Sequence, residues 1–210
     1  MTPEDACKFT DYICRLAPVI PVLVIEDATI AEPLAEALVS GGLPTLEVTL
    51  RSAAALDAIK AMSKVAGATV GAGTLLSGQD VRAAKEAGAV FGVSPGATDS
   101  LLQACEDSEM PLLPGAATAT EVMRLMERGY RMQKFFPAEA SGGAPALKSI
   151  GGPLPQVTFC PTGGIGVANA ATSSQLSNSV WVGGGSVSAN SLVGTHEGLR
   201  REAACTLGGR

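Results

Sequence analysis

The chain has 210 residues, and 46% of them are hydrophobic while only 4% are aromatic. This length fits a single domain spanning residues 1–210, in which roughly 70% of the surface of the unfolded chain could be buried. A formal net charge of −5 argues against a broad nucleic-acid-binding surface, although a local cluster of donors could still bind an anionic substrate.

The predicted elements begin with a helix over Pro3–Leu16, which we expect to cover the bottom of the fold. Eight short β-rich runs follow, and successive runs start roughly 20–26 residues apart, about the length of one strand plus one helix. These runs are Val19–Ile25, Thr45–Leu50, Ala68–Ala72, Val90–Ser94, Pro111–Pro114, Met132–Phe136, Gln156–Cys160 and Ser179–Val182.

Ala-rich amphipathic stretches lie between the runs, for example at residues 31–42, 52–65, 78–88 and 118–129. Their apolar residues recur three and four positions apart, and several end at glycine, as helices do. Alternating strands and helices imply a parallel sheet with helices outside it, and eight repeats in about 200 residues predict an α/β fold, a (β/α)8 TIM barrel with an N-terminal capping helix. A doubly wound open sheet is the alternative, but it usually needs fewer strands and an early nucleotide-binding motif.

Polar residues interrupt the second run. Strand alternation places its apolar residues on one face and its polar residues on the other, namely Thr45, Glu47, Thr49 and Arg51. Because the apolar face must meet the helices, the polar face should point into the barrel and toward its C-terminal mouth, where barrel enzymes place catalytic residues. An internal ion pair between Glu47 and Arg51 is the alternative interpretation.

Lys134 interrupts the sixth run, where it follows Gln133 and precedes two phenylalanines. A closed barrel has no exposed edge strand on which such a lysine could be solvated, so we expect Lys134 to have a chemical role. A buried lysine amine can attack a ketone and form a Schiff base.

Loops after the runs carry further candidate groups. Thr74 follows the third run, and Pro95 lies in a Ser-Pro-Gly turn after the fourth. Glycine-rich segments at Pro161–Gly166 and Gly183–Ser186 follow the seventh and eighth runs. TIM barrels commonly bind phosphate after these two strands, with backbone N–H groups as donors. The two segments therefore predict a phosphate site.

No apolar run reaches the ~18 residues that a transmembrane helix needs, so we expect no membrane association. The polar N-terminus of mixed charge does not resemble a signal peptide. Five scattered cysteines without metal-ligand spacing favour reduced thiols in a cytoplasmic protein. One histidine cannot supply the several ligands typical of zinc enzymes, so we expect no metal.

Five motifs, LEVTLR, VGAGT, SPG, KFFPAE and FCPTGG, occur in this order and together resemble the 2-keto-3-deoxy-6-phosphogluconate (KDPG) aldolase family. The resemblance extends from about Leu16 to Ser186. It implies a class I aldolase of the Entner–Doudoroff pathway that releases pyruvate and glyceraldehyde 3-phosphate. Members often also cleave 4-hydroxy-2-oxoglutarate. The resemblance further implies a homotrimer that needs neither a metal nor another cofactor.

The resemblance also implies roles for individual residues. Lys134 would form the Schiff base, and Glu47 would be the general acid/base. Arg51 and Thr74 would hold the pyruvyl carboxylate, and Pro95 would line the same subsite. Thr162 would contact the hydroxylated carbons, whereas the phosphate would be received by Gly163, Gly164, Gly184, Gly185 and Ser186.

Three alternatives remain open from the sequence. The same chemistry could act on 2-keto-3-deoxy-6-phosphogalactonate. A phosphosugar isomerase or epimerase on this barrel would need no Schiff base, and a phosphosugar-binding protein would need no catalytic groups. Reduction by borohydride in the presence of pyruvate distinguishes a Schiff-base enzyme from the last two.

Overall fold

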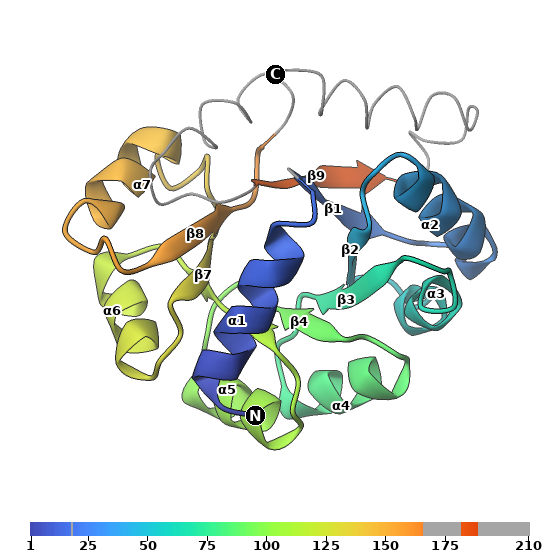
Figure 1. The fold of residues 1–210 in the computed structure, drawn as a ribbon, viewed down its shortest axis with the longest axis horizontal. Coiled ribbons are helices and arrows are strands. Elements are labelled where there is room, and N and C mark those ends of the chain that lie inside the picture. The colour runs from blue at the N-terminus through green and yellow to red at the C-terminus, as the bar shows by residue number, and fades with distance from the viewer. Residues whose placement is uncertain (18, 166–181, 189–210) are drawn as a thin grey trace.

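The computed structural model describes residues 1–17, 19–165 and 182–188, and strands and helices alternate along this part of the chain. Figure 1 shows the strands as a ring with helices around its outside. Every described strand pair is parallel. The fold is therefore the predicted (β/α)8 TIM barrel with a helix at its N-terminus.

The helices closely follow the apolar periodicity of the sequence. They are α1 (Pro3–Cys14), α2 (Ala31–Ser40), α3 (Ala55–Met62), α4 (Gly78–Glu86), α5 (Asp99–Asp107), α6 (Ala119–Glu127) and α7 (Gly143–Gly151), with a short 3-10 helix η1 (Ala28–Ile30) before α2. Threonine or serine side chains cap the N-termini of α1, α4, α5 and α6, as expected for helices that begin directly after a loop.

The described strands form two sheets, with orders β5-β4-β3-β2-β1-β9 and β6-β7-β8. Their bounds are β1 (Val19–Val24), β2 (Thr45–Thr49), β3 (Thr69–Gly73), β4 (Phe91–Val93), β5 (Leu112–Leu113), β6 (Gly115–Ala116), β7 (Met132–Phe135), β8 (Thr158–Pro161) and β9 (Val182–Ser188). The last strand pairs with the first, which brings the two ends of the barrel sequence together.

The predicted fifth strand is divided at Pro114. β5 pairs with β4, whereas β6 pairs with β7. Proline has no N–H to donate to a neighbouring strand, so regular pairing is interrupted at this residue. Its carbonyl oxygen still accepts a hydrogen bond of 2.8 Å from the backbone N–H of Lys134. Segments β5 and β6 together therefore occupy one strand position of the ring.

The prediction that Gly183–Ser186 follow the last strand was wrong. Residues 179–181 lie outside the described residues, and the strand β9 extends to Ser188, so that Gly183–Ser186 are part of it. In its pairing with β1, Gly184 is opposite Pro21 and Ser186 is opposite Val22, which leaves Gly185 as an extra residue in a bulge. Glycine usually indicates a turn, but in a strand it also marks bulges and close backbone approach.

Helix α1 crosses the ring of strands in Figure 1. It begins with a capped turn in which the Thr2 side chain accepts a hydrogen bond from the N–H of Asp5. Its buried residues recur at helical spacing and end with Ile13 and Cys14. These two residues pack inside the barrel, and the carbonyl oxygen of Ile13 accepts a hydrogen bond from Thr45, the first residue of β2. Helix α1 thus closes the N-terminal end of the barrel, as predicted.

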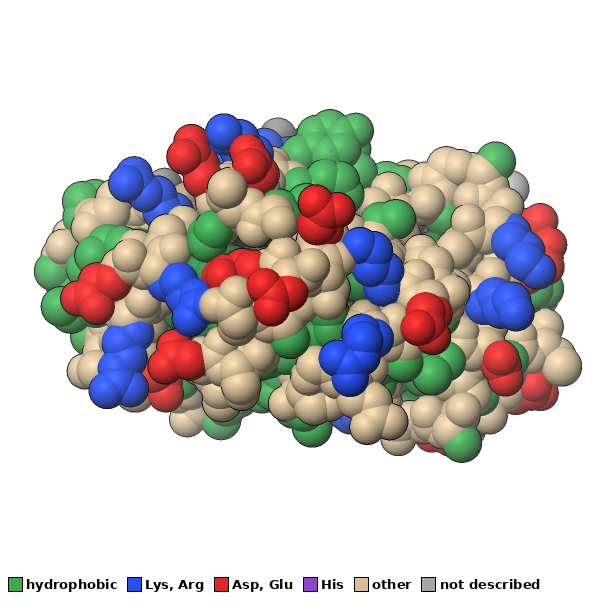
Figure 2. Space-filling model, turned by 90° about the horizontal axis from the view of Figure 1, so that it is seen from below, with side chains coloured by type: hydrophobic (Ala, Val, Ile, Leu, Met, Phe, Trp, Pro, Cys, Tyr) green, Lys and Arg blue, Asp and Glu red, His purple; other side chains and the backbone are tan. Residues whose placement is uncertain are grey.

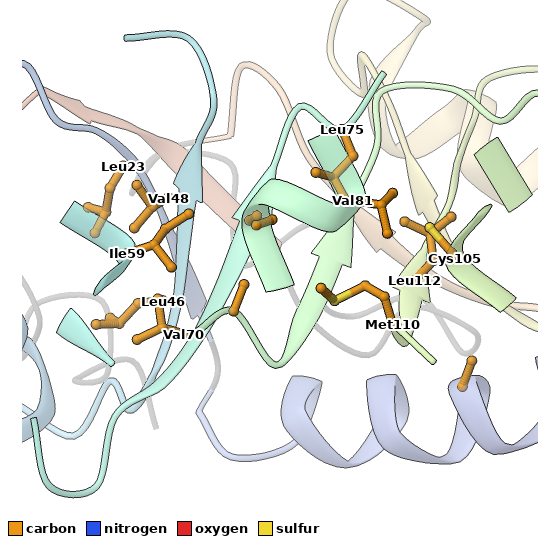
Figure 3. Packing of buried hydrophobic residues seen from close by; sticks show 14 of the residues in the cluster. Leu23, Leu46, Val48, Ile59, Val70, Leu75, Val81, Cys105, Met110 and Leu112 are labelled. Carbon is orange, nitrogen blue, oxygen red and sulfur yellow. The ribbon is translucent and has the colours of Figure 1, made fainter. Parts of the chain in front are cut away.

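Two apolar clusters stabilise the barrel. The larger lies between strands and helices, and Figure 3 shows part of it, including Leu46 and Val48 of β2 near Ile59 of α3. The smaller cluster combines α1 with residues from several strands, namely Ile13, Cys14, Ile20, Phe91, Val93, Leu113, Met132 and Cys160. This lumen cluster packs α1 against strands of both sheets.

The described surface carries mixed charges. Figure 2 shows Lys and Arg side chains interspersed with Asp and Glu over one face, without a continuous basic surface there. Arg128, for example, forms an ion pair of 2.9 Å with Glu106. None of the helices in the described part of the chain combines the length and apolar character needed to span a membrane.

Candidate active site

Lys134 and Glu47 form a buried ion pair inside the barrel. Only 5% of Lys134 and 4% of Glu47 is exposed. The Nζ atom of Lys134 donates a hydrogen bond of 3.4 Å to Oε1 of Glu47. Because β7 and β2 are not neighbours in either sheet, the two side chains meet across the lumen. The partner of Glu47 is thus Lys134, and not Arg51 as in the alternative interpretation.

Strand alternation in β2 explains the position of Glu47. The hydroxyl of Thr45 donates to the carbonyl oxygen of Ile13, and that of Thr49 donates to the carbonyl oxygen of Leu23, each at 3.0 Å. Both threonines are buried, so these bonds offset the cost of taking their hydroxyls out of water. The polar face predicted for this strand therefore points inward, with Glu47 between the two threonines.

An aromatic ring lies next to the amine of Lys134. The ring centroid of Phe136 is 5.1 Å from Nζ, close enough for a favourable cation–π contact. Phe136 is two residues after Lys134 and therefore on the same side of the chain as it leaves β7. The amine thus has a carboxylate and an aromatic face as neighbours.

The sequence-predicted carboxylate-binding residues lie where strands end. Arg51 is exposed just after β2, and its Nε donates a hydrogen bond of 3.2 Å to Oγ1 of Thr49. Thr74 directly follows β3, is half-buried and has a φ of +62°. Pro95 is half-buried after β4. All three therefore follow the C-terminal ends of consecutive strands, on the side of the barrel where enzymes of this fold bind substrates.

The turn after β8 is fixed against the segment after β7. Thr162 is buried, and its carbonyl oxygen accepts a hydrogen bond of 2.8 Å from the N–H of Ala138. Gly163 and Gly164 have φ values of +99° and +76°, which side chains rarely tolerate. A Cβ atom on Gly163 would also lie 3.2 Å from the ring of Phe136. This turn therefore lies beside the neighbours of Lys134.

The backbone of β9 carries the other predicted phosphate residues. Gly184 is in register with Pro21, and Ser186 is in register with Val22. Val22 is in turn in register with Glu47 of β2. The backbone of Ser186 is therefore level with Glu47, two strands away, and lies within a strand and not in a turn beyond it.

Two cysteines are buried in the interior of the barrel. Cys160 is in register with Lys134 and belongs to the lumen cluster, as does Cys14. A hydrogen bond with Cys160 and then burial raise the pKa of the Cys14 thiol well above its ordinary value. The described residues contain no group of three or more His, Cys, Asp or Glu side chains that could hold a metal ion.

Comparison with known proteins assigns the chain to a family. Residues 10–200 match the family described as KDPG and KHG aldolase, in which KHG is 2-keto-4-hydroxyglutarate, the same compound as 4-hydroxy-2-oxoglutarate. The chain belongs to this family. The match covers all of the motifs from which the resemblance was inferred.

Members of the KDPG and KHG aldolase family resemble the chain in sequence and in structure. It is 49% identical over 175 residues to the KHG/KDPG aldolase of Escherichia coli K12, covering 83% of this chain and 82% of that protein. The KDPG aldolase of Zymomonas mobilis, solved with 3-phosphoglycerate, has a TM-score of 0.89, 46% identity and 95% coverage of both chains. KDPG aldolase from Legionella pneumophila, solved with pyruvate captured as a covalent carbinolamine, has a TM-score of 0.80, 41% identity and 93% coverage of both chains.

The structure brings some of the predicted site residues together. Lys134 and Glu47 are in contact, and Arg51, Thr74 and Pro95 follow neighbouring strands. Two neighbours of the pair were not predicted: Phe136, whose ring lies beside Nζ, and Gly73 of β3, where an added Cβ atom would lie 2.2 Å from Oε1 of Glu47. Alternation along the sixth run could have identified Phe136, but no sequence pattern indicates which side chain a strand glycine such as Gly73 would contact.

Proposed function

We propose that this chain is a class I aldolase that cleaves KDPG to pyruvate and glyceraldehyde 3-phosphate, and KHG to pyruvate and glyoxylate. The contact between Lys134 and Glu47 carries the proposal, because it places an amine nucleophile and an acid/base group together in a protected lumen. The covalent pyruvate adduct of the Legionella relative supports the chemistry, and the name of the E. coli relative supports both substrates.

The first half of the proposed reaction forms an iminium ion. The unprotonated Nζ of Lys134 attacks the C2 ketone carbon and gives a carbinolamine. Glu47 is within 3.4 Å of Nζ and can accept the proton that the amine must lose. It then gives this proton to the carbinolamine hydroxyl, water leaves, and a C=N bond with a positive nitrogen remains while Glu47 is again a carboxylate.

The second half breaks the C3–C4 bond. Glu47 accepts the proton of the C4 hydroxyl, the C3–C4 electron pair moves toward the iminium nitrogen, and the aldehyde product leaves. The enamine that remains takes up a proton at C3. Water then hydrolyses the iminium, which releases pyruvate and restores the lysine. The reaction uses protein groups alone, so we propose no cofactor.

We assign the remaining contacts to the two ends of the substrate. At one end, the exposed guanidinium of Arg51 and the hydroxyl of Thr74 hold the pyruvyl carboxylate, and Pro95 lines this subsite. Thr162 contacts the hydroxylated carbons. The phosphate binds to the glycine-rich segments of the turn after β8 and of β9, namely Gly163, Gly164, Gly184, Gly185 and Ser186.

Trapping the Schiff base tests the proposal. The chain is incubated with pyruvate, reduced with borohydride, digested and mapped by mass spectrometry. We expect one adduct, on Lys134, and none in Lys134→Met. A coupled assay with lactate dehydrogenase should detect pyruvate release from KDPG by the wild type alone. An adduct on another lysine would contradict the assignment of Lys134, and the absence of any adduct would favour an isomerase or a binding protein.

Substrate preference needs a separate measurement. Relative kcat/KM values on KDPG, KHG and 2-keto-3-deoxy-6-phosphogalactonate rank the three substrates. We expect KDPG to rank first. A higher value for the galactonate analogue would overturn this ranking while leaving the Schiff-base mechanism intact.

We also propose that the chain forms one domain, assembles as a homotrimer and is cytoplasmic. The likeness to the KDPG and KHG aldolase family, whose members are commonly homotrimeric, supports the trimer. The free thiols of Cys7, Cys14, Cys105 and Cys160 suit a reducing compartment. Light scattering coupled to size-exclusion chromatography should give three times the mass of one chain, and the mass of a single chain would contradict the trimer.

A further inference from the structure

Gly73, the last residue of β3, lies directly against the carboxylate of Glu47. A Cβ atom built on Gly73 would lie 2.2 Å from Oε1, 2.8 Å from Cγ and 2.9 Å from Cδ of Glu47. These separations are shorter than any non-bonded contact between such atoms, so no side chain fits there while Glu47 keeps its position. The Oε1 atom that faces Gly73 is also the atom that accepts the hydrogen bond from Lys134.

Backbone conformation does not explain the glycine. Thr74, the next residue, has a positive φ, but Gly73 itself does not. Any residue could therefore adopt the backbone of Gly73, which is paired with Thr49 in a regular parallel ladder. The feature that requires a glycine at this position is the space occupied by Glu47.

A second glycine of β3 provides a contrast. Gly71 lies two residues earlier, so it faces the same side of the strand. A Cβ atom there would lie 2.3 Å from the ring of Phe91, a buried residue of the lumen cluster. A methyl group at position 71 would thus meet a rigid ring, whereas a methyl group at position 73 would meet the end of a flexible side chain. The first should disturb packing, and the second should move the Glu47 carboxylate.

We propose that Gly73 is a positioning residue for the aldol reaction: the space left by its missing side chain holds the Glu47 carboxylate beside Lys134. This inference rests on the proposed function, in which Glu47 transfers protons at the C4 hydroxyl and near Nζ. Proton transfer requires donor and acceptor within hydrogen-bond distance, and a shift of about 1 Å can reduce a rate by ~100-fold.

Gly73→Ala provides the first test. We expect kcat for KDPG cleavage to fall by up to about 100-fold with little change in KM. The amount of pyruvate trapped on Lys134 at saturation should stay at the wild-type level, because the nucleophile is intact. Exchange of the pyruvate C3 protons with D2O, followed by NMR, should slow in parallel with cleavage. A Gly73→Ala variant with unchanged cleavage and exchange would overturn the proposal.

Gly71→Ala is the matched control. It adds the same methyl group to the same face of the same strand, but against Phe91. We expect a lower Tm and a wild-type ratio of cleavage rate to trapped adduct, measured on the folded fraction. If this ratio falls as it does in Gly73→Ala, any methyl group in the lumen has the effect, and the assignment to Gly73 is wrong.

A double-mutant cycle with Glu47→Asp tests whether the effect acts through the carboxylate. Aspartate is one methylene shorter, so its carboxylate withdraws from the space next to Gly73. Glu47→Asp alone should be slow, but adding Gly73→Ala to it should change kcat by less than about twofold, whereas two independent changes would each keep their full effect. An equal loss in both backgrounds would show that the methyl group acts elsewhere.

The same experiments separate this inference from the proposed function. If the wild-type chain forms no borohydride adduct on Lys134, the aldolase assignment fails and the inference fails with it. If the wild type forms the adduct and Gly73→Ala cleaves KDPG normally, only the inference fails.

Discussion

A buried pair of opposite charges contributes little to stability, because taking both ions out of water costs about as much as their attraction returns. Lys134 and Glu47 nevertheless lie in the lumen, where apolar side chains could fill the space. The hydrogen bond between Nζ and Oε1 is long, at 3.4 Å, so its geometry does not strengthen the pair. At the scale of single residues, this costly arrangement is best explained by chemistry.

Glu47→Gln should leave the final yield of pyruvate trapped on Lys134 intact, although the adduct forms more slowly, and should reduce kcat for KDPG by ~10²–10⁴-fold, because an amide of the same shape cannot accept the hydroxyl proton. Steady-state kinetics and borohydride trapping measure the two effects. Glu36→Gln, on the exposed face of α2, is the matched control and should match the wild type. A Glu47→Gln variant with normal turnover would remove Glu47 from the mechanism.

Thr74→Asn should stabilise the fold by about 1 kcal/mol, because asparagine tolerates the left-handed backbone that a β-branched residue adopts only with strain. Urea unfolding measures this gain. The same change should raise KM for KDPG, because it removes the hydroxyl assigned to the carboxylate subsite. Glu109→Asn is a control at φ +50°, after α5, and should stabilise without any effect on KM. Equal KM values in both variants would contradict the subsite assignment.

Some residues of the site could be predicted from sequence because they break a local rule. Lys134 and Glu47 are charged residues in strands that should be apolar, and alternation places Glu47 on the inner face. The contact between Gly73 and Glu47 depends on side-chain packing between two strands, and no local rule reports it. The distance of Gly73 and Glu47 from Lys134 depends on how the whole ring of strands closes. The periodicity of the sequence does not predict that distance.

At the scale of elements, the helices were easier to predict than the strands. Helix α6 carries a capping box in which Thr118 and Glu121 exchange hydrogen bonds with each other's backbone N–H groups. This local pattern is readable from sequence. By contrast, β9 begins at Val182 and includes three consecutive glycines, and pairing with β1 overrides their weak strand propensity. The division of the fifth strand at Pro114 also depends on which neighbours pair on either side.

Thr118→Ala should lower the free energy of unfolding by about 1 kcal/mol, because the N–H of Glu121 loses its partner at the start of α6. Urea unfolding measures the loss. Thr120→Ala removes the same atoms two residues later, at an exposed position of the same helix, and should change stability by less than about 0.5 kcal/mol. Equal losses would show that the cap contributes nothing specific.

At the scale of the whole molecule, folding should become less favourable in alkali. Burial raises the pKa of Cys105 to about 12 from an ordinary value of 9.0. Burial, followed by the charge of Glu106, likewise raises the pKa of Tyr130. Above the ordinary values the unfolded chain loses these protons while the folded chain keeps them. The contribution of the protonated Cys105 thiol to stability is therefore fully present below pH 9 and is lost as the pH rises toward 12.

Cys105→Ala tests this pH dependence. The free energy of unfolding of the wild type should fall more steeply above pH 9 than that of the variant, by up to about 1.4 kcal/mol per pH unit. Urea midpoints measured at several pH values between 8 and 11 give the two slopes. The small cavity that the substitution leaves lowers the free energy of unfolding of the variant equally at every pH. It therefore does not affect the comparison of the two slopes. Identical slopes would show that Cys105 does not contribute to the alkaline loss.

Pairing of the last strand with the first affects how the protein can fold during its synthesis. The apolar strand β1 leaves the ribosome early, but its partner β9 follows only near the end of the barrel sequence. At 5–20 residues per second, the edge of β1 remains unpaired for about 10–30 s, and such edges bind other chains. Pro21, in the middle of β1, lacks an N–H group and lies where the register with β9 shifts. This residue weakens the exposed edge as a template for aggregation until β9 completes the ring.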